Sequence, residues 1–384
     1  MPGKLRIGIV GMGAAGWALV PAIRGSAAFE LAAVAEPAAD VRETVANELN
    51  VAVYPDLPAM LEKAALDAVY IATPTELHPE HVALVCSAKK NVLTEKPMAI
   101  RVEQAQAMVE QAEKAGVVLQ VGHSHSYDLP IARMREIVAS GTLGRARMLH
   151  TWNFTDWMAR PRRAAELDVT QGGGVTYRQG AHQIDILRLL GGGLVKSVRA
   201  TTFDWDANRR SIGAHAIFLN FADGAAATAI YNGYGFFPGA ELTAGVGEWG
   251  ELSKPRTATK PAAPLSPEEE LAAKRKRSRN AIPAKAPHQP HFGLTMVSCE
   301  RGDIRQSPDG LSVYSDKGRE EIALSKDTSP RDLVIAEFAR AIEGKPVTHT
   351  GGWGLANLEV CTAAIESSRS GKEIELKHQV AVAE

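Results

Sequence analysis

A glycine-rich loop, Gly11-Met12-Gly13-Ala14-Ala15-Gly16, constrains the fold of this chain more than any other feature of its sequence. The loop follows the apolar run LRIGIV and leads into a helical pattern. In that context the first glycine makes a tight turn, the second lets backbone approach a pyrophosphate, and the third lets the helix pack on the strand. The helix N-terminus then offers free N–H groups to the phosphates. A dinucleotide-binding loop is therefore favoured over a glycine turn in a nucleotide-free sheet.

Short apolar runs alternate with helical patterns from the start of the chain to about His123. The strand-like runs are LRIGIV, FELAAVAE, LDAVYIAT, NVLTEKP and VVLQVGH, and helical stretches separate them. This alternation predicts a parallel sheet with right-handed crossovers. We therefore expect an α/β fold with an N-terminal Rossmann dinucleotide-binding domain at residues 1–123.

The pattern changes over residues 124–384. A helical stretch is followed by strand-like stretches at 145–154, 195–205, 214–221 and 225–235, with the turn signal Asp223-Gly224 between the last two. We expect a C-terminal α/β substrate-binding domain with a mostly antiparallel open sheet. Residues 250–291 are rich in Pro, Lys and Ala and contain the basic run Lys274 to Arg279. A solvated insertion is favoured there over a nucleic-acid patch or a localisation signal.

The composition excludes several classes of function. The chain has 384 residues and a net charge of −1, so no overall field attracts nucleic acid or an anionic membrane. No run is long and apolar enough to cross a bilayer, and the strand close to Met1 leaves no room for a signal peptide. Cys86, Cys299 and Cys361 are far apart and lack metal-ligand spacing. We expect a cytoplasmic protein with structural thiols and no metal.

Glu36 indicates which nucleotide the loop takes. It ends the second predicted strand, after the glycine loop and its helix. A carboxylate at that place accepts hydrogen bonds from the adenosine ribose hydroxyls and repels a 2′-phosphate, which favours NAD over NADP. Arg42 lies nearby in the sequence and keeps NADP open.

Two further motifs fall at the carboxyl ends of successive predicted strands, Thr73-Pro74 and Glu95-Lys96-Pro97. Open α/β sheets bind their ligands at this edge. An ammonium group there can hydrogen-bond a substrate hydroxyl, and burial lowers a lysine pKa toward the range useful in acid–base chemistry. The alternative for Lys96 is a surface ion pair with Glu95, which its place at the sheet edge disfavours.

In these motifs and in others along almost its whole length, the chain resembles the Gfo/Idh/MocA family of NAD(P)-dependent oxidoreductases. The resemblance rests on the glycine loop, TPTELH, EKP, the run GGGVTYRQGAHQID and the closing LEVCTAAIESSRSGKEIEL. It implies a Rossmann domain and a C-terminal domain whose open sheet forms homo-oligomer contacts. It also implies that Lys96 and His182 are catalytic. The residues implied to line the cofactor, besides the glycine loop and Glu36, are Thr73, Pro74, His78, Glu95, Lys96 and Pro97.

One position departs from the family pattern. Members that act on sugars and inositols commonly carry an acid where this chain has Arg178, whereas the second acid, Asp185, is kept. In a continuous helix Arg178, His182 and Asp185 would share one stripe. An arginine presents a fork of donors suited to a carboxylate or phosphate, and its charge disfavours the protonated form of His182. Contact with an anionic substrate is favoured over a purely structural pair with Asp185.

Other residues extend the expected substrate site. Arg160, Arg162 and Arg163 precede the triple glycine, Trp152, Trp157 and Tyr177 add flat apolar surface or core, and His123, His125 and Tyr127 follow the last Rossmann strand. For the histidines, substrate hydrogen bonding is favoured over a metal, because no acidic or cysteine partner accompanies them.

Within the family, the chain is similar to the branch that oxidises phthalate 4,5-cis-dihydrodiol to 4,5-dihydroxyphthalate. That similarity implies a small, anionic, aromatic-derived substrate held by Arg178, Asp185, Arg160, Arg162, His123 and Tyr127. The alternatives are a sugar, sugar-acid or inositol dehydrogenase and, in a different class, a non-catalytic NAD(P)-binding regulator. The presence of both Lys96 and His182 argues against the regulator.

Overall fold

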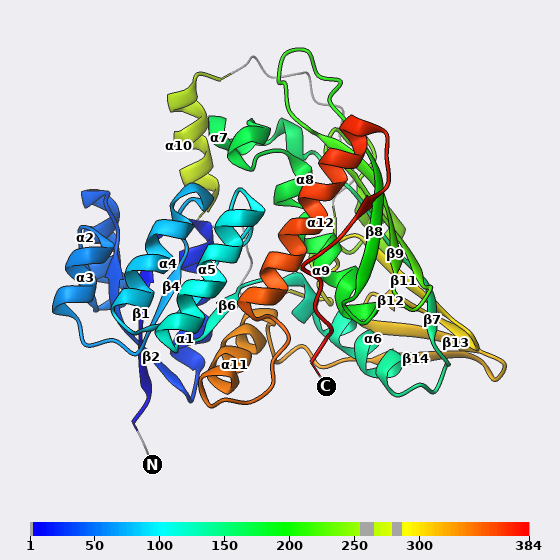
Figure 1. Cartoon of the computed structure of the whole chain (residues 1–384), viewed down its shortest axis with the longest axis horizontal. Helices are drawn as coiled ribbons and strands as arrows, with labels where there is room; N and C mark the ends of the chain where they lie inside the picture. Colours follow the sequence, from blue (N-terminus) through cyan, green and yellow to red (C-terminus); the bar gives the residue numbers. More distant parts are fainter. Residues whose placement is uncertain (1–2, 254–264, 279–285, 384) are drawn as a thin grey trace.

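The computed structural model describes residues 3–253, 265–278 and 286–383, which form two β-sheets with helices between and around them (Figure 1). The predicted insertion at 250–291 therefore lies partly outside the described residues, as does Arg279 of its basic run. The α/β fold expected from the sequence is confirmed.

The N-terminal sheet has six parallel strands in the order β3-β2-β1-β4-β5-β6. The strands are β1 Leu5–Val10, β2 Phe29–Ala35, β3 Ala52–Tyr54, β4 Ala68–Ile71, β5 Asn91–Thr94 and β6 Leu119–Val121. The helices between them are α1 Ala14–Gly25, α2 Ala39–Leu49, α3 Leu57–Lys63, η1 Thr75–Leu77, α4 His78–Ser87 and α5 Val102–Ala115. Short β3 and α3 are additions to the predicted elements. The carboxyl ends of β1, β4 and β5 bring the glycine loop, Thr73 and Lys96 to one edge.

The second sheet has nine strands in the order β14-β13-β12-β11-β7-β10-β9-β8-β15. Its neighbours are antiparallel except for the parallel pair β7 and β10, so the mostly antiparallel sheet is confirmed. Asp223 and Gly224 lie in the turn between β9 and β10, where Gly224 has a φ of 86°. The strands are β7 Ala146–Phe154, β8 Val195–Phe203, β9 Ala214–Phe221, β10 Ala226–Asn232, β11 Leu294–Cys299, β12 Gly302–Ser307, β13 Gly310–Ser315, β14 Gly318–Ala323 and β15 Ile374–Glu375.

Helices cover one face of this sheet and fill the space toward the Rossmann domain (Figure 1). They are η2 His125–Tyr127, α6 Leu129–Ala139, η3 Trp157–Ala159, α7 Ala164–Leu167, η4 Val169–Gln171, α8 Val175–Arg178, α9 Gly180–Leu190, η5 Gly239–Thr243, α10 Pro267–Ser278, α11 Pro330–Ile342 and α12 Gly351–Ser370. Every residue of α9 is buried, because the helix packs against β7, β10, α6 and α12.

Arg188 locks α9 to α12. Its side chain is fully buried, and its guanidinium lies 3.7 Å from the centroid of the Trp353 ring. It also donates to the Trp353 carbonyl and to Asn357 Oδ1, both at 3.1 Å. A buried guanidinium is tolerated only when its donors are matched in this way. The helix that carries His182 is therefore held rigidly.

The last part of the chain returns to the Rossmann domain. Phe338 of α11 stacks on Phe29 of β2 with ring centroids 5.6 Å apart, in the core that also contains Ile7 and Ile9. The His349 carbonyl accepts a hydrogen bond from Val121 N at 3.0 Å. Although we expected residues 124–384 to form a separate domain, α11 packs into the core of the N-terminal sheet.

Helix α10 of the predicted insertion is docked by ion pairs. Glu270 accepts two hydrogen bonds from Arg209, at 2.7 and 2.9 Å, and one from the backbone N–H of Arg162 at 2.7 Å. Lys274 of the basic run pairs with Glu166 of α7. Helix α10 therefore lies beside α7, as Figure 1 also shows.

Candidate active site between the two sheets

The glycine loop has the shape that a pyrophosphate requires. Gly11 has a φ of +91°, and a Cβ there would lie 2.9 Å from the Ala72 carbonyl oxygen. A Cβ at Gly16 would overlap the Gly11 carbonyl oxygen, whereas Gly13 faces open space with nothing within 4 Å. Helix α1 begins at Ala14, and no side chain caps it, so its first backbone N–H groups stay available to a phosphate. The loop is an open, uncapped phosphate cradle.

Glu36 is held at the end of β2 by the loop itself. Its carboxylate accepts from Met12 N at 2.9 Å and from Ala38 N at 3.0 Å. Arg42 donates to the carbonyls of Glu36 and Pro37, at 2.8 and 2.7 Å. Each carboxylate oxygen keeps a free acceptor site, so Glu36 fits the ribose hydroxyls of an adenosine.

His78 braces the two loops at the sheet edge. One ring nitrogen lies 2.9 Å from the Thr73 carbonyl, and the other lies 3.1 Å from the Pro97 carbonyl. Burial lowers the pKa of His78 to about 4, so the ring is neutral. Pro74 precedes η1, and Thr73 Oγ1 lies 3.0 Å from His81 Nδ1. His78 therefore joins the Thr73 loop to the lysine turn and is itself almost completely buried.

Lys96 follows β5 in a turn whose Lys96–Pro97 peptide bond is cis. Its neighbour Glu95 accepts from the Tyr70 hydroxyl at 2.6 Å. The amine of Lys96 donates to the Arg178 carbonyl at 3.1 Å. Burial lowers the pKa of Lys96 to about 8, opposed by Glu95 and reinforced by the positive charge of Arg178. A lysine in this state exchanges a proton near neutral pH.

A break in the helix explains why the Arg178 carbonyl is available. Helix α8 ends at Arg178, and α9 begins at Gly180. The His182 N–H bonds to the Gln179 carbonyl at 3.0 Å, whereas a continuous α-helix would take it to Arg178. The predicted continuous stripe of Arg178, His182 and Asp185 is therefore interrupted, and the freed carbonyl orients the amine of Lys96.

His182 lies in the same site as a neutral imidazole. Burial, together with the charges of Lys96 and His125, lowers its pKa well below the usual value. Its ring packs edge-on against His125, with centroids 4.7 Å apart, and lies 5.0 Å from Phe292. The buried Nδ1 has no hydrogen-bond partner among the described residues. A neutral imidazole with an open nitrogen can accept a proton or a hydrogen bond.

The side chain of Arg178 crosses to the Rossmann domain. Its Nη1 donates to Thr75 Oγ1 of η1 at 3.1 Å. Its Nε and Nη2 are buried and have no partner among the described residues. Buried donors are normally satisfied, and those of a charged group are the costliest to leave unpaired. The geometry therefore presents two donors of one guanidinium to a ligand.

Three further residues of the predicted substrate site are buried in the core, namely His123, Tyr127 and Asp185. Asp185 is fully buried and accepts from Trp353 Nε1 at 2.7 Å, and its other oxygen lies 3.9 Å from His123 Nδ1. His123 Nε2 lies 3.2 Å from Asn357 Nδ2, and Tyr127 packs on the ring of His349 with centroids 4.4 Å apart. All three support the histidine helix from within the core, and the structure places Asp185 away from Arg178.

The neighbouring arginines differ in their surroundings. Arg162 lies 4.0 Å over the buried Trp157 ring, and its Nε is buried without a partner among the described residues. Arg160 pairs with Asp156 at 2.6 Å and lines a cavity of about 380 Å³. Arg163 pairs with Glu76 at 3.2 Å. Arg162 and Arg178 thus each have a buried donor without a partner among the described residues.

From the sequence we expected His125 to hydrogen-bond substrate and to have no acidic partner, and Glu248 and Arg331 were missed. His125 Nδ1 lies 3.0 Å from Asp128, and its Nε2 lies 3.6 Å from Glu248. Although burial opposes it, these two carboxylates raise the pKa of His125 to about 9. Arg331 at the start of α11 lies 5.3 Å from the Trp249 ring. The spacing of His125 and Asp128 could have indicated that pair, but Glu248 comes from a distant loop without a motif.

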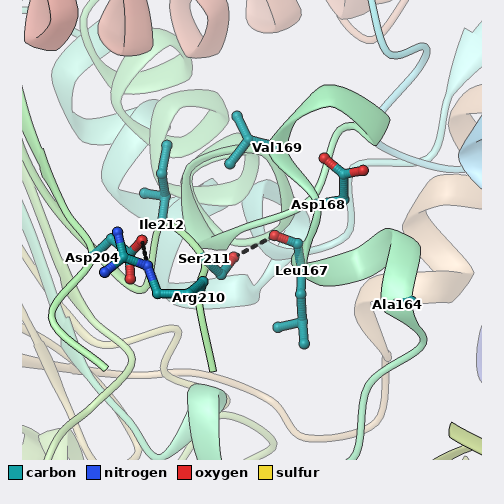
Figure 2. Close-up of a pocket in the computed structure, with 8 residues that line it drawn as sticks. All are labelled: Ala164, Leu167, Asp168, Val169, Asp204, Arg210, Ser211 and Ile212. Atoms are coloured by element: carbon teal, nitrogen blue, oxygen red, sulfur yellow. Dashed lines mark hydrogen bonds and ion pairs between the residues drawn. The ribbon is translucent and has the colours of Figure 1, made fainter. Parts of the chain in front are cut away.

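A second cavity, of about 540 Å³, is lined by residues of α7 and η4 and by residues 204 and 210–212 (Figure 2). None of the predicted site residues lines it. Its charged lining groups are Asp168, Asp204 and Arg210, of which Arg210 pairs with Asp204 at 2.9 Å. Ser211 donates to the Leu167 carbonyl at 2.7 Å. This hollow is separate from Lys96 and His182.

No three His, Cys, Asp or Glu side chains in the described ranges are grouped to hold a metal ion. Likewise, none of the helices in that part of the chain has the length and apolarity to span a bilayer.

Comparisons with known proteins agree with this geometry. The model of the GFO/IDH/MocA oxidoreductase family with an NAD-binding Rossmann fold matches residues 5–123. The GFO/IDH/MocA C-terminal domain model matches residues 131–236.

Individual relatives cover nearly the whole chain. The 1-carboxy-3-chloro-3,4-dihydroxycyclohexa-1,5-diene dehydrogenase of Comamonas testosteroni is 35% identical over 377 residues, 95% of each chain. The crystal structure of a dehydrogenase from Bordetella bronchiseptica RB50 is 36% identical, with a TM-score of 0.89 over 97% of this chain and 100% of that one. An Agrobacterium radiobacter oxidoreductase in complex with NAD+, L-tartaric acid and magnesium shares the fold, with 19% identity and a TM-score of 0.73 over 97% and 98% of the two chains.

Proposed function

Because this chain belongs to the GFO/IDH/MocA family of NAD-binding oxidoreductases, we propose that it oxidises a carboxylated cis-dihydrodiol, specifically phthalate 4,5-cis-dihydrodiol to 4,5-dihydroxyphthalate. The family assignment makes the chain a dehydrogenase. The substrate is the proposed part. It is supported by the arginines of the site and by the carboxylated dihydroxycyclohexadiene in the name of the Comamonas testosteroni relative.

The residues at the first sheet edge fit NAD. Gly13 leaves room for a pyrophosphate, the uncapped N-terminus of α1 faces it, and Glu36 is placed for the ribose hydroxyls. Bound NAD supplies the acceptor for the hydride. We propose that Thr73, Pro74, Glu95 and Pro97 form the wall near its reactive end, braced by His78.

Lys96 and His182 are the proposed acid–base pair. Both side chains are buried and close enough for the charge of Lys96 to lower the pKa of His182, which is a neutral ring, whereas Lys96 has a pKa of about 8. Neutral Lys96 takes the proton of the reacting hydroxyl as the C–H bond of the same carbon breaks, and the ring N–H of neutral His182 donates a hydrogen bond to the oxygen of that hydroxyl and orients it. The resulting ketone tautomerises to a catechol, and aromatisation makes oxidation favourable.

One observation carries the choice of an acidic substrate, namely the two buried donors of Arg178, close to Lys96, that have no partner in the described parts of the chain. A carboxylate accepts two parallel hydrogen bonds from one guanidinium. A neutral polyol would leave the positive charge of this group buried and uncompensated. Arg162, with its unpaired Nε, is placed to assist with the same or a second carboxylate.

The test is NADH formation from carboxylated cis-dihydrodiols, inositols and aldoses. We expect turnover of the dihydrodiols, and we expect Arg178→Ala to lower kcat/KM for them about 10- to 100-fold while the Kd for NAD changes little. Arg163→Ala is the matched control, since its guanidinium already pairs with Glu76. Good turnover of a neutral sugar with none of any dihydrodiol would establish the alternative, a sugar or inositol dehydrogenase.

We also propose that the open face of the nine-stranded sheet forms a homo-oligomer contact. Met148 of β7 and Phe218 of β9 are 51% and 41% exposed, and both lie on the face that includes Thr228 of β10. Exposed apolar side chains gathered on one face are typical of interfaces. Light scattering of wild type and Phe218→Glu tests this, with a smaller assembly expected for the variant.

A further inference from the structure

Glu248 lies on a loop that is closed by its own hydrogen bonds and tied to the segment before β11. The loop follows η5, and its turn is closed by a hydrogen bond of 2.8 Å from Gly247 N to the Glu251 carbonyl. The Glu251 carboxylate accepts from Trp249 N at 2.9 Å, and His291 N donates to the Gly247 carbonyl at 3.2 Å. Glu248 therefore projects from a rigid turn, with its side chain 24% exposed.

The side chain of Glu248 faces the proposed catalytic pair through His125. Its Oε1 lies 3.6 Å from His125 Nε2, while the opposite nitrogen of that ring lies 3.0 Å from Asp128. The His125 ring stacks on Phe292 at 4.4 Å and packs edge-on against His182 at 4.7 Å. Glu248 is thus separated from His182 by one imidazole ring, and the ion pair that it forms with His125 is long.

The charges around Glu248 keep it ionised. Burial would raise the pKa of this carboxyl, but His125, Arg160 and Lys96 together lower it. Glu248 and Arg160 both line the cavity of about 380 Å³. Of the three carboxylates that line this cavity, Asp156 pairs with Arg160 and Glu251 is bound to its own turn, whereas Glu248 keeps acceptor sites to spare. That carboxylate attracts hydroxyl groups and repels carboxylates.

We propose that Glu248 is a substrate-contacting specificity residue that accepts a hydrogen bond from the non-reacting hydroxyl of the bound diol. This inference rests on the proposed function, which supplies the vicinal diol. Together with Arg178, Glu248 gives the site a polarity along the substrate, with carboxylates directed to the guanidinium and hydroxyls directed to the glutamate. One substrate orientation then satisfies both charges.

Product analogues test this without depending on turnover. Titration calorimetry on the NADH-saturated enzyme compares benzoate, 3-hydroxybenzoate, 4-hydroxybenzoate and 3,4-dihydroxybenzoate. We expect wild type to bind the dihydroxy acid about 10-fold or more tighter than either monohydroxy acid. Glu248→Gln keeps the shape of the side chain and should bring the ratio close to one for the monohydroxy acid that keeps the reacting hydroxyl, because only the contact with the non-reacting hydroxyl is lost. Glu251→Gln is the matched control, since Glu251 lines the same cavity but is bound to the backbone of its own turn.

The possible results distinguish a failure of the Glu248 role from a failure of the proposed acidic substrate. Binding of benzoate with an unchanged dihydroxy preference in Glu248→Gln overturns the role of Glu248 alone. No binding of any of the four acids overturns the acidic substrate as well. An NMR titration of His125 completes the design, because its pKa should fall in Glu248→Gln. That fall without any change in dihydroxy preference would make Glu248 only a counterion for His125 and would also overturn the proposal.

Discussion

The rate of substrate oxidation should follow the ionisation of Lys96. Burial, reinforced by Arg178 and opposed by Glu95, lowers the pKa of this amine from 10.5 to about 8. At pH 7 such an amine is neutral in about one molecule in ten, whereas an ordinary lysine is neutral in about one in 3,000. If neutral Lys96 takes the hydroxyl proton, kcat/KM should rise about tenfold between pH 7 and pH 9 and then level off.

The assay is the initial rate of NADH formation with a carboxylated dihydrodiol from pH 6 to pH 10. Lys96→Met should lower kcat/KM about 100- to 10,000-fold and remove the rising limb. His182→Asn should lower the rate but keep the limb, because the pKa of His182 lies well below this range. A flat wild-type profile, or a limb that survives in Lys96→Met, would refute the assignment.

A substitution of Arg178 should shift the pH dependence of the same reaction. Its positive charge lowers the pKa of Lys96, so Arg178→Gln should favour the ammonium form and move the limb to higher pH. Arg163→Gln, whose guanidinium is paired with Glu76, should leave the limb in place. A limb that moves to lower pH in Arg178→Gln would show that the two groups are not electrostatically coupled as the structure indicates.

Further predictions concern the cofactor cradle and the core. Gly13→Ala should keep the wild-type Tm and weaken NAD binding in a fluorescence titration, whereas Gly16→Ala should lose about 1–3 kcal/mol of stability or more, because its methyl group meets backbone. Glu36→Ala should raise the Kd for NAD about 10-fold and reduce the preference over NADP, and an unchanged preference would contradict its ribose role. Arg188→Met should lower the free energy of unfolding in urea by about 3 kcal/mol or more, since it strands acceptors in the core.

The elements with strong local patterns could be predicted from sequence. The strand, glycine loop and helix around Gly13 are specified by neighbours in the chain, and so is the turn at Asp223 and Gly224. Strand β3 and helix α3 were missed because three and seven residues carry little periodicity. The Asp56 cap, which accepts from Ala59 N at 2.8 Å, is the signal that could have located α3.

The site was predictable only where one segment carries the chemistry. Lys96 and His182 each belong to a motif that can be found in the sequence. The two side chains come together because the two sheets pack against each other. The separation of Arg178 from Asp185 could not be foreseen, because it depends on the helix break at Gln179 and on the indole of Trp353. Glu248 depends on a loop far away in sequence, whose place is set by tertiary contacts alone.

The interrupted helix gives Arg178 two tasks, one for its backbone and one for its side chain. Its backbone carbonyl anchors the amine of Lys96, while its side chain contacts Thr75 and, in the proposed function, holds a substrate carboxylate. Any residue that tolerates this backbone would preserve the anchor, so a substitution at position 178 changes the pKa of Lys96 but not the hydrogen bond that orients its amine. Substrate charge and the pH range of catalysis are therefore expected to change together at this single position.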